Sequence, residues 1–181
     1  MRSSLIKQVK IAVLSGMAFM IMLLPHVPIF PPAPFLTYDA SEVPALLGGF
    51  ALGPWAGMAI VIVKNLLILL YRFGPAHLVG IPMNTLAGCA LVGVSASFYW
   101  RGKSMRTAAI GLLLGTLAMA AVMIPANYLI FDTIMGIMNL TPSFSVSFYV
   151  LALCTPFNLI KGLLSSLLAF LIYKRVSAVL K

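Results

Sequence analysis

Residues 108–131 read AAIGLLLGTLAMAAVMIPANYLIF, an apolar stretch without a charged side chain. A membrane-spanning helix needs about 20 apolar residues, so this stretch is long enough to cross a bilayer. The rest of the 181-residue chain has the same character: 62% of its residues are hydrophobic, 8% are charged, and its mean hydropathy is +1.09. We therefore expect an integral membrane protein with no room for a water-soluble catalytic domain.

Apolar runs on both sides of this stretch predict further helices. The runs 43–53 and 54–71 could form one helix, but Gly53-Pro54 lies between them, and proline disfavours helix at the preceding residue. The run 43–53 reaches only about 16 Å, so its helix must begin earlier, within 39–42, or end inside the bundle. The predicted spans are 9–24, 43–53, 54–71, 78–100, 108–131 and 148–173.

The basic residues decide between five and six spans. Six spans that begin in the cytoplasm leave Arg72 as the only basic residue in an outer connection, whereas fusing 43–71 puts more basic residues outside than inside. The positive-inside rule therefore predicts an all-α membrane protein, a six-helix bundle with both termini cytoplasmic. The net charge of +9 then mainly reflects topology, with nucleic-acid or anionic-lipid binding as the alternative. The inner basic residues are Arg2, Lys7, Lys10, Arg101, Lys103, Arg106, Lys174, Arg175 and Lys181.

The N-terminal run could also be read as a signal peptide, because basic residues precede it. The segment that follows, PHVPIFPPAP at 25–34, is unlike a small-residue cleavage site, so we expect the run to be retained as the first span. Residues 25–42 then form an outer connection, either a plain solvated loop or a lid over the mouth of the bundle.

Polar side chains inside the predicted spans are the candidates for function, because hydrocarbon penalises them. Each alone could be a helix-packing hydrogen bond or a lysine that reaches the headgroups. In the six-span topology, however, they collect in the outer half of the bundle, which is typical of a pocket open to the exterior and not of a channel. They are Lys64, Asn65, Asn84, Asn127, Asn158 and Lys161.

The chemistry of these residues favours binding over catalysis. Thr155, Asn158 and Lys161 share one helix face. An asparagine side chain offers both a donor and an acceptor, so several amides suit a neutral heteroaromatic ligand edged with N–H and C=O groups, and suit a metal ion poorly. The acids Asp39, Glu42 and Asp132 lie near outer helix ends or loops, and no His, Cys and acid cluster has metal-ligand spacing. We expect no enzyme activity, no metal and no cofactor.

Small residues at four-residue spacing mark places where helices can approach closely. We expect Gly49 and Gly57, and likewise Gly111 and Gly115, to serve packing inside the bundle. Ala12 and Gly16, on a helix short of polar anchors, could instead face a partner subunit.

Several motifs together resemble one family, the riboflavin-specific substrate-capture components (S components) of energy-coupling factor (ECF) vitamin transporters. The resemblance covers residues 8–175, and the last two of its motifs are the specific ones. The motifs are LTYDASEVPAL at 36–46, GPWAG at 53–57, KNLL at 64–67, Met83-Asn84, MIPANY at 123–128 and PFNLIKG at 156–162.

This resemblance implies a six-helix protein of the bacterial plasma membrane that takes riboflavin from outside and docks on a membrane scaffold driven by two ATP-binding subunits, without nucleic acid. The loop before the second helix would act as a lid. Ala12 and Gly16 match a docking motif, although the family commonly has alanine at the position of Gly16. The implied ring-binding residues are Asn127, Asn158 and Lys161, and those for the rest of the pocket are Leu36, Thr37, Tyr38 and Asn84.

The resemblance assigns no firm role to Lys64, for which we expect a pairing with Asp39 and not a ligand contact; Asn65 is either structural or part of the pocket. Two alternatives stay open. One is an S component for another vitamin, such as thiamine or biotin. The other is an autonomous secondary carrier or a small membrane enzyme, which would need an acid inside the membrane.

Overall fold

The computed structural model describes residues 2–31, 33–137 and 145–180, and these are mostly helical. Lys181, counted above as an inner tail residue, lies outside them. The helices are α1 (Arg2–Leu23), α2 (Glu42–Leu52), α3 (Pro54–Tyr71), α4 (Pro75–Gly102), α5 (Met105–Ile137), α6 (Val146–Phe148) and α7 (Thr155–Leu180), with a π-helical segment η1 (Tyr149–Cys154) between α6 and α7. A short hairpin joins β1 (Val27–Pro28) to β2 (Thr37–Tyr38).

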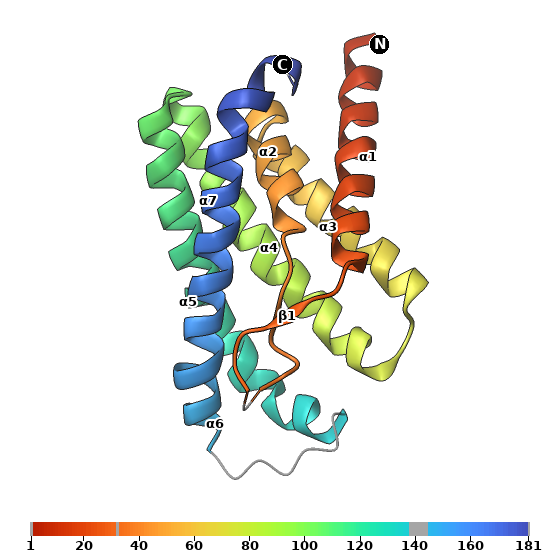
Figure 1. Ribbon diagram of the computed structural model, residues 1–181, viewed down its shortest axis with the longest axis vertical. Coiled ribbons are helices and arrows are strands. Elements are labelled where there is room, and N and C mark those ends of the chain that lie inside the picture. The colour runs from red at the N-terminus through yellow and green to blue at the C-terminus, as the bar shows by residue number, and fades with distance from the viewer. Residues whose placement is uncertain (1, 32, 138–144, 181) are drawn as a thin grey trace.

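Five helical stretches in the described part of the chain are long and apolar enough to cross a membrane. They are α1, α3, α4, α5 and the continuous stretch from α6 to α7, while α2 is a shorter apolar helix. The helices form one bundle, in which the start of α1 and the end of α7 lie at the same end (Figure 1). The structure thus supports a multi-helix membrane bundle.

The break expected at Gly53-Pro54 is confirmed, because α2 ends at Leu52 and α3 begins at Pro54. Gly53 has a φ of 109°, a conformation that favours glycine. The indole N–H of Trp100 donates to the carbonyl oxygens of Gly49 and Phe50, at 3.0 and 3.1 Å. Gly49 also accepts from the backbone N–H of Gly53, so these bonds together cap the end of α2.

Several helices extend beyond the predicted spans, whereas α3 coincides with the predicted span 54–71. For example, α1 begins at Arg2 and not at residue 9, and α5 continues to Ile137 and not to residue 131. Hydropathy marks the part of a helix that suits lipid, whereas the helix itself continues until its backbone is capped or broken. The short second helix begins at Glu42, which is fully buried, and spans 11 residues, so its N-terminal end lies inside the bundle.

Close packing at small residues confirms the expected role of the internal glycines. A Cβ added at Gly57 would lie 2.8 Å from the Cα of Gly49, and one added at Gly115 would lie 2.5 Å from the carbonyl oxygen of Leu91. The first contact holds α2 against α3, and the second holds α5 against α4. These contacts hold the helices together in one half of the bundle. The polar residues discussed below lie in the other half.

Candidate functional site

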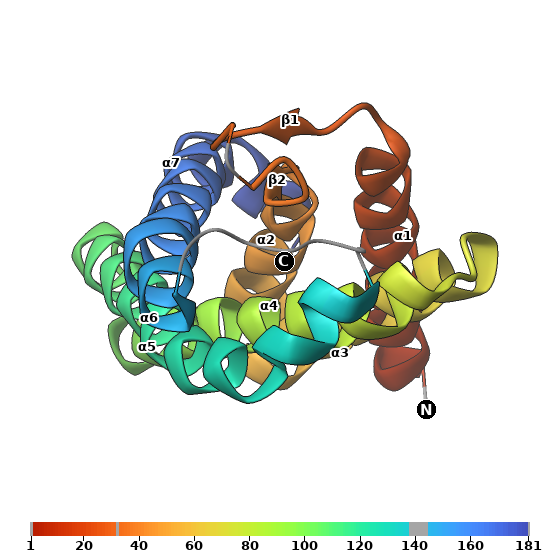
Figure 2. The same ribbon diagram turned by 90° about the horizontal axis from the view of Figure 1, so that it is seen from below.

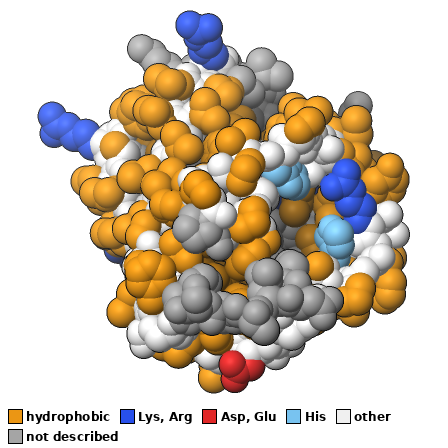
Figure 3. Space-filling view, turned by 60° about the horizontal axis from the view of Figure 1, so that its bottom comes forward, with side chains coloured by type: hydrophobic (Ala, Val, Ile, Leu, Met, Phe, Trp, Pro, Cys, Tyr) orange, Lys and Arg blue, Asp and Glu red, His pale blue; other side chains and the backbone are white. Residues whose placement is uncertain are grey.

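A cavity of about 280 Å³ lies in the half of the bundle away from the start of α1 and the end of α7. Side chains from α4, α5, η1 and α7 line it, together with the connection between α1 and α2, Met22 of α1 and Ile68 of α3. Seen along the bundle, β1 bridges from α1 toward α7 (Figure 2). Figure 3 shows the hollow on this face, with histidine and basic side chains beside it on a largely hydrophobic surface.

Most of the residues predicted for the pocket do line this cavity. They come from four separate segments of the chain, which explains why only the folded structure joins them. The predicted residues that line it are Leu36, Thr37, Asp39, Asn84, Asn127, Asn158 and Lys161.

Tyr38 is the exception among the predicted pocket residues, because it does not line the cavity. It follows Thr37 in β2, and successive side chains of a strand point to opposite faces. With Thr37 facing the cavity, Tyr38 is turned away. Its hydroxyl oxygen is buried without a hydrogen-bond partner in the described part of the chain.

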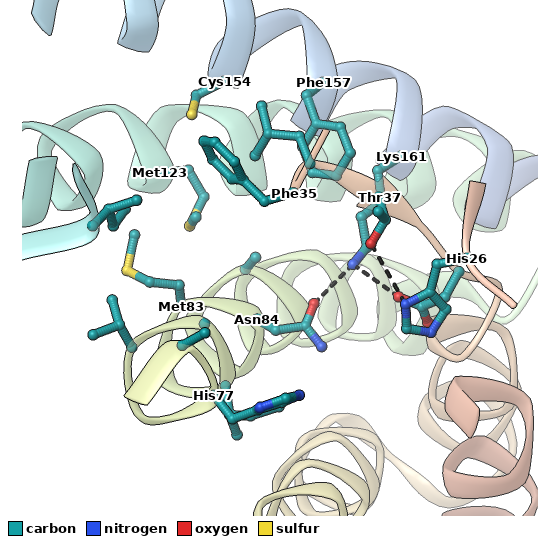
Figure 4. A pocket seen from close by; sticks show the side chains of 18 of the residues that line it. His26, Phe35, Thr37, His77, Met83, Asn84, Met123, Cys154, Phe157 and Lys161 are labelled. Carbon is teal, nitrogen blue, oxygen red and sulfur yellow. Dashed lines mark hydrogen bonds and ion pairs between the residues drawn. The ribbon is translucent and has the colours of Figure 1, made fainter. Parts of the chain in front are cut away.

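Lys161 on α7 is the charged centre of the site, with only 4% of its surface exposed. Its ammonium group donates to Asn84 Oδ1 at 2.8 Å and lies 3.4 Å from Asp39 Oδ2 (Figure 4). Burial alone would raise the pKa of Asp39, but the ammonium groups of Lys161 and Lys64 hold that pKa well below its usual range. The site therefore contains a paired cation and anion.

Asn84 and Asn65 form a pair of hydrogen-bonded amides beside Lys161. The ammonium group of Lys161 can only donate, so Asn84 must turn its oxygen toward Lys161 and its amino group away from it. That amino group donates to Asn65 Oδ1 at 3.0 Å. Asn65 does not line the cavity and lies behind Asn84, so of the two expected roles its place fits the structural one.

Asn127 and Asn158 are held by their own helices. Asn127 Nδ2 donates to the carbonyl oxygen of Met123, and Asn158 Nδ2 donates to that of Cys154, both at 2.8 Å. Each bond uses one of the two N–H groups of the amide. The amide also has an oxygen that can accept a hydrogen bond. Both side chains thus keep donor and acceptor capacity for a ligand while their orientation is fixed.

The π-helical segment η1 shapes the wall between α5 and α7. It ends at Cys154, just before Pro156, a residue that cannot supply a backbone donor to the preceding turn. Such wide turns are frequent at functional sites. Here the segment contributes Tyr149 and Cys154 to the cavity lining. Pro156 was the sequence signal for this irregularity.

Apolar side chains make up much of the remaining wall, and sequence analysis assigned them no role in the pocket. Phe35, Phe157, Met83 and Met123 point into the space bordered by Asn84 and Lys161 (Figure 4). Aromatic faces and thioethers suit the burial of a flat ring. In the sequence of an apolar helix, a Met or Phe that lines a cavity looks the same as one that faces lipid, so no sequence signal marks it.

The connection between α1 and α2 forms part of the wall of the cavity. Val27 pairs with Tyr38 in the β1–β2 hairpin, and His26 Nδ1 lies 3.5 Å from Thr37 Oγ1. The other ring nitrogen of His26 lies 2.8 Å from the carbonyl oxygen of Met22, so this histidine ties the end of α1 to β2. His26, Arg72 and His77 also line the cavity.

Lys64 has a different partner from the expected one. Its ammonium group lies 2.8 Å from Glu42 Oε1 and also donates to Ser41, whereas Asp39 pairs with Lys161. The reason is that α2 begins at Glu42, which places this carboxylate against α3 and leaves Asp39 in the preceding loop. Glu42, expected near an outer helix end, is fully buried. Lys64 does not line the cavity.

The two small residues on α1 take no part in the site. Ala12 is exposed, and a Cβ added at Gly16 would meet nothing within 4 Å among the described residues. This face of α1 is open in the structure.

In the part of the chain that the structure describes, no group of three or more His, Cys, Asp and Glu side chains could hold a metal ion.

Comparison with known proteins assigns a family to this architecture. A family model described as "ECF transporter, substrate-specific component" matches residues 7–173. A solved structure described as the S component of a bacterial ECF transporter superposes with a TM-score of 0.82 at 31% sequence identity, covering 97% of each chain.

Two curated relatives are similar over nearly the whole chain. Riboflavin transporter RibU of Staphylococcus aureus (strain TCH60) is 34% identical over 176 residues, which cover 96% of this chain and 91% of the relative. Riboflavin transporter FmnP of Bacillus subtilis (strain 168) is 34% identical over 172 residues, which cover 92% and 90%.

Proposed function

The chain belongs to the family of ECF transporter substrate-specific components, and from this premise we propose that it captures riboflavin for uptake. It is a transport protein and not an enzyme, because the relatives that match over nearly its whole length are named as transporters. Riboflavin is the transported ligand, and we expect the protein to need no cofactor of its own.

The single observation that carries this proposal is the convergence of amide and amine side chains on one cavity. Asn84, Asn127, Asn158 and Lys161 come from three helices and border the same space. The isoalloxazine ring of riboflavin is flat and apolar at one end, and it alternates N–H and C=O groups along the other edge. The aromatic and methionine wall would bury the ring, while the polar residues select the edge.

The topology of the protein in the membrane forms a second part of the proposal. We infer six crossings with both termini in the cytoplasm of a bacterial cell, in its plasma membrane. The positive-inside pattern of the sequence supports this inference, as does the position of the start of α1 and the end of α7 at one end of the bundle. The cavity would then open to the exterior, where riboflavin is taken up.

Delivery requires partners. We infer that the exposed face of α1 at Ala12 and Gly16 docks on a membrane scaffold subunit, which two ATP-binding subunits drive. The open space around Gly16, where an added Cβ would have no described neighbour within 4 Å, supports this inference. Small residues allow the close helix approach that such docking needs.

The colour of the purified protein is the first test. Protein expressed in medium with riboflavin and purified in detergent should be yellow, and its absorption spectrum should be that of a flavin. A colourless preparation that added riboflavin does not saturate would contradict the proposal and favour an S component for another vitamin.

A further inference from the structure

A closed ring of polar contacts runs behind and through the cavity. It begins at Asn65 on α3, passes to Asn84 on α4 and then to Lys161 on α7. From Lys161 the contacts return through the loop before α2 and the start of α2 to Lys64 on α3, which precedes Asn65 in the sequence. The returning contacts join Lys161 to Asp39, Asp39 to the backbone N–H of Ser41, and Ser41 and Glu42 to Lys64.

We propose that Asp39 and Asn65 are positioning residues, which act through Lys161 and Asn84 to fix the atoms that these two cavity residues offer to the ligand. This inference rests on the proposed function, because it concerns the same cavity. It assigns to Asp39, which itself borders the cavity, and to Asn65 on α3, which does not, a part in ligand selection through Lys161 and Asn84.

Charge and geometry together give Asp39 this role. A cation as buried as Lys161 is costly without a counter-ion, and Asp39 supplies one at 3.4 Å. The other carboxylate oxygen, Asp39 Oδ1, accepts from the backbone N–H of Ser41 at 2.9 Å, so the carboxylate is itself held in place. An ammonium group has three N–H donors. With two directed at Asn84 and Asp39, the third remains for the ligand within the described structure.

Asn65 acts through the orientation of its neighbour. An amide can be flipped with little change in shape, and the flip exchanges donor for acceptor. Asn65 Oδ1 receives the amino group of Asn84 and thereby holds the oxygen of Asn84 toward Lys161. The amino group of Asn65 is buried without a partner among the described residues. A buried donor left unpaired is unfavourable, so the contribution of Asn65 lies in its oxygen.

The second ion pair of the ring provides a matched control. Glu42 is more deeply buried than Asp39 and also pairs with a lysine, but neither Glu42 nor Lys64 lines the cavity. Replacing Glu42 by Gln removes a buried charge from the same network. A loss of affinity that merely follows from general destabilisation should therefore appear in both variants.

The test is a double-mutant cycle on full-length protein in detergent, with riboflavin as the titrant. We expect Asp39→Asn to weaken binding at least tenfold when Lys161 is present, and to have no further effect beside Lys161→Met. Glu42→Gln should stay within threefold of the wild type. For Asn65, the Leu variant should lose at least fivefold, whereas Asn65→Asp, which keeps the accepting oxygen, should retain most of the affinity.

Several outcomes would overturn the proposal. An unchanged riboflavin affinity of the Asp39→Asn variant would do so. A double variant in which the losses caused by Asp39→Asn and Lys161→Met multiply would also do so, because Asp39 would then act independently of Lys161. Equal losses in Asp39→Asn and Glu42→Gln would show a purely structural role. Wild-type protein that fails to bind riboflavin would instead refute the proposed function, so the two failures are distinguishable.

Discussion

The carboxylate of Glu42 lies 2.8 Å from the ammonium group of Lys64, and both side chains are fully buried. This pair joins the first turn of α2 to the middle of α3. Breaking such a pair by removing one partner leaves an uncompensated charge, which is more harmful than removing both.

We therefore expect Lys64→Met to lower the free energy of unfolding by about 3–5 kcal/mol. A double variant that replaces both Glu42 and Lys64 by Met should cost less than the single one, because no charge is then left alone. Thermal or chemical unfolding in detergent measures both. A double variant that is less stable than Lys64→Met would argue against an uncompensated carboxylate as the cause.

The cavity amides and amine should decide affinity. We expect Asn158→Ala or Lys161→Ala to weaken riboflavin binding at least tenfold without unfolding the protein, because ligand groups would lose partners in a buried site. Calorimetry of the purified variants gives the affinity. Ser165→Ala on the same helix is the control, since Ser165 does not line the cavity. Affinity that is unaltered by both cavity substitutions would count against the site.

The exposed face of α1 should matter for delivery and not for capture. Replacing Ala12 or Gly16 by Trp should leave riboflavin affinity unchanged and abolish uptake by cells, because bulk on this face prevents close helix approach. Leu171→Trp, on an exposed position of α7, is the matched control and should transport normally. Normal uptake by the α1 variants would remove the docking proposal.

The contribution of Asp39 to the stability of the folded protein should depend on pH only in acid. The pKa of Asp39 is lowered in the folded protein from its ordinary value of 3.8, so the folded state favours the carboxylate. Its contribution is fully present above that ordinary value and is lost as the pH falls below it toward the lowered one. We expect the melting temperature difference between wild type and Asp39→Asn to be constant from pH 8 to about 5 and to shrink below about 4. A difference that grows in acid would contradict this assignment.

The sequence was most informative where a residue contrasts with its surroundings. Asn84, Asn127, Asn158 and Lys161 were identified because hydrocarbon penalises polar groups, and the break at Gly53 because backbone chemistry requires one. The face of α1 at Ala12 and Gly16 was found from residue spacing and from the family resemblance, and its partner stays a prediction.

The remaining features depend on the fold. The pairing of Lys64 with Glu42 instead of Asp39 follows from the start of α2 at Glu42, a boundary that hydropathy does not fix. The side-chain direction of Tyr38 follows from a two-residue strand that has no sequence pattern of its own. Phe35 and Met83 line the cavity, but apolar residues also make up the lipid-facing surface, so the sequence does not distinguish them.

The most direct test of riboflavin capture is a fluorescence titration of ligand-free purified protein with riboflavin, thiamine and biotin. Riboflavin fluorescence should be quenched in a saturable manner with one ligand per protein, because the ring enters a single cavity lined by aromatic side chains, and neither other vitamin should compete. Absence of saturation with riboflavin, or displacement of riboflavin by thiamine or biotin at equal concentration, would contradict it.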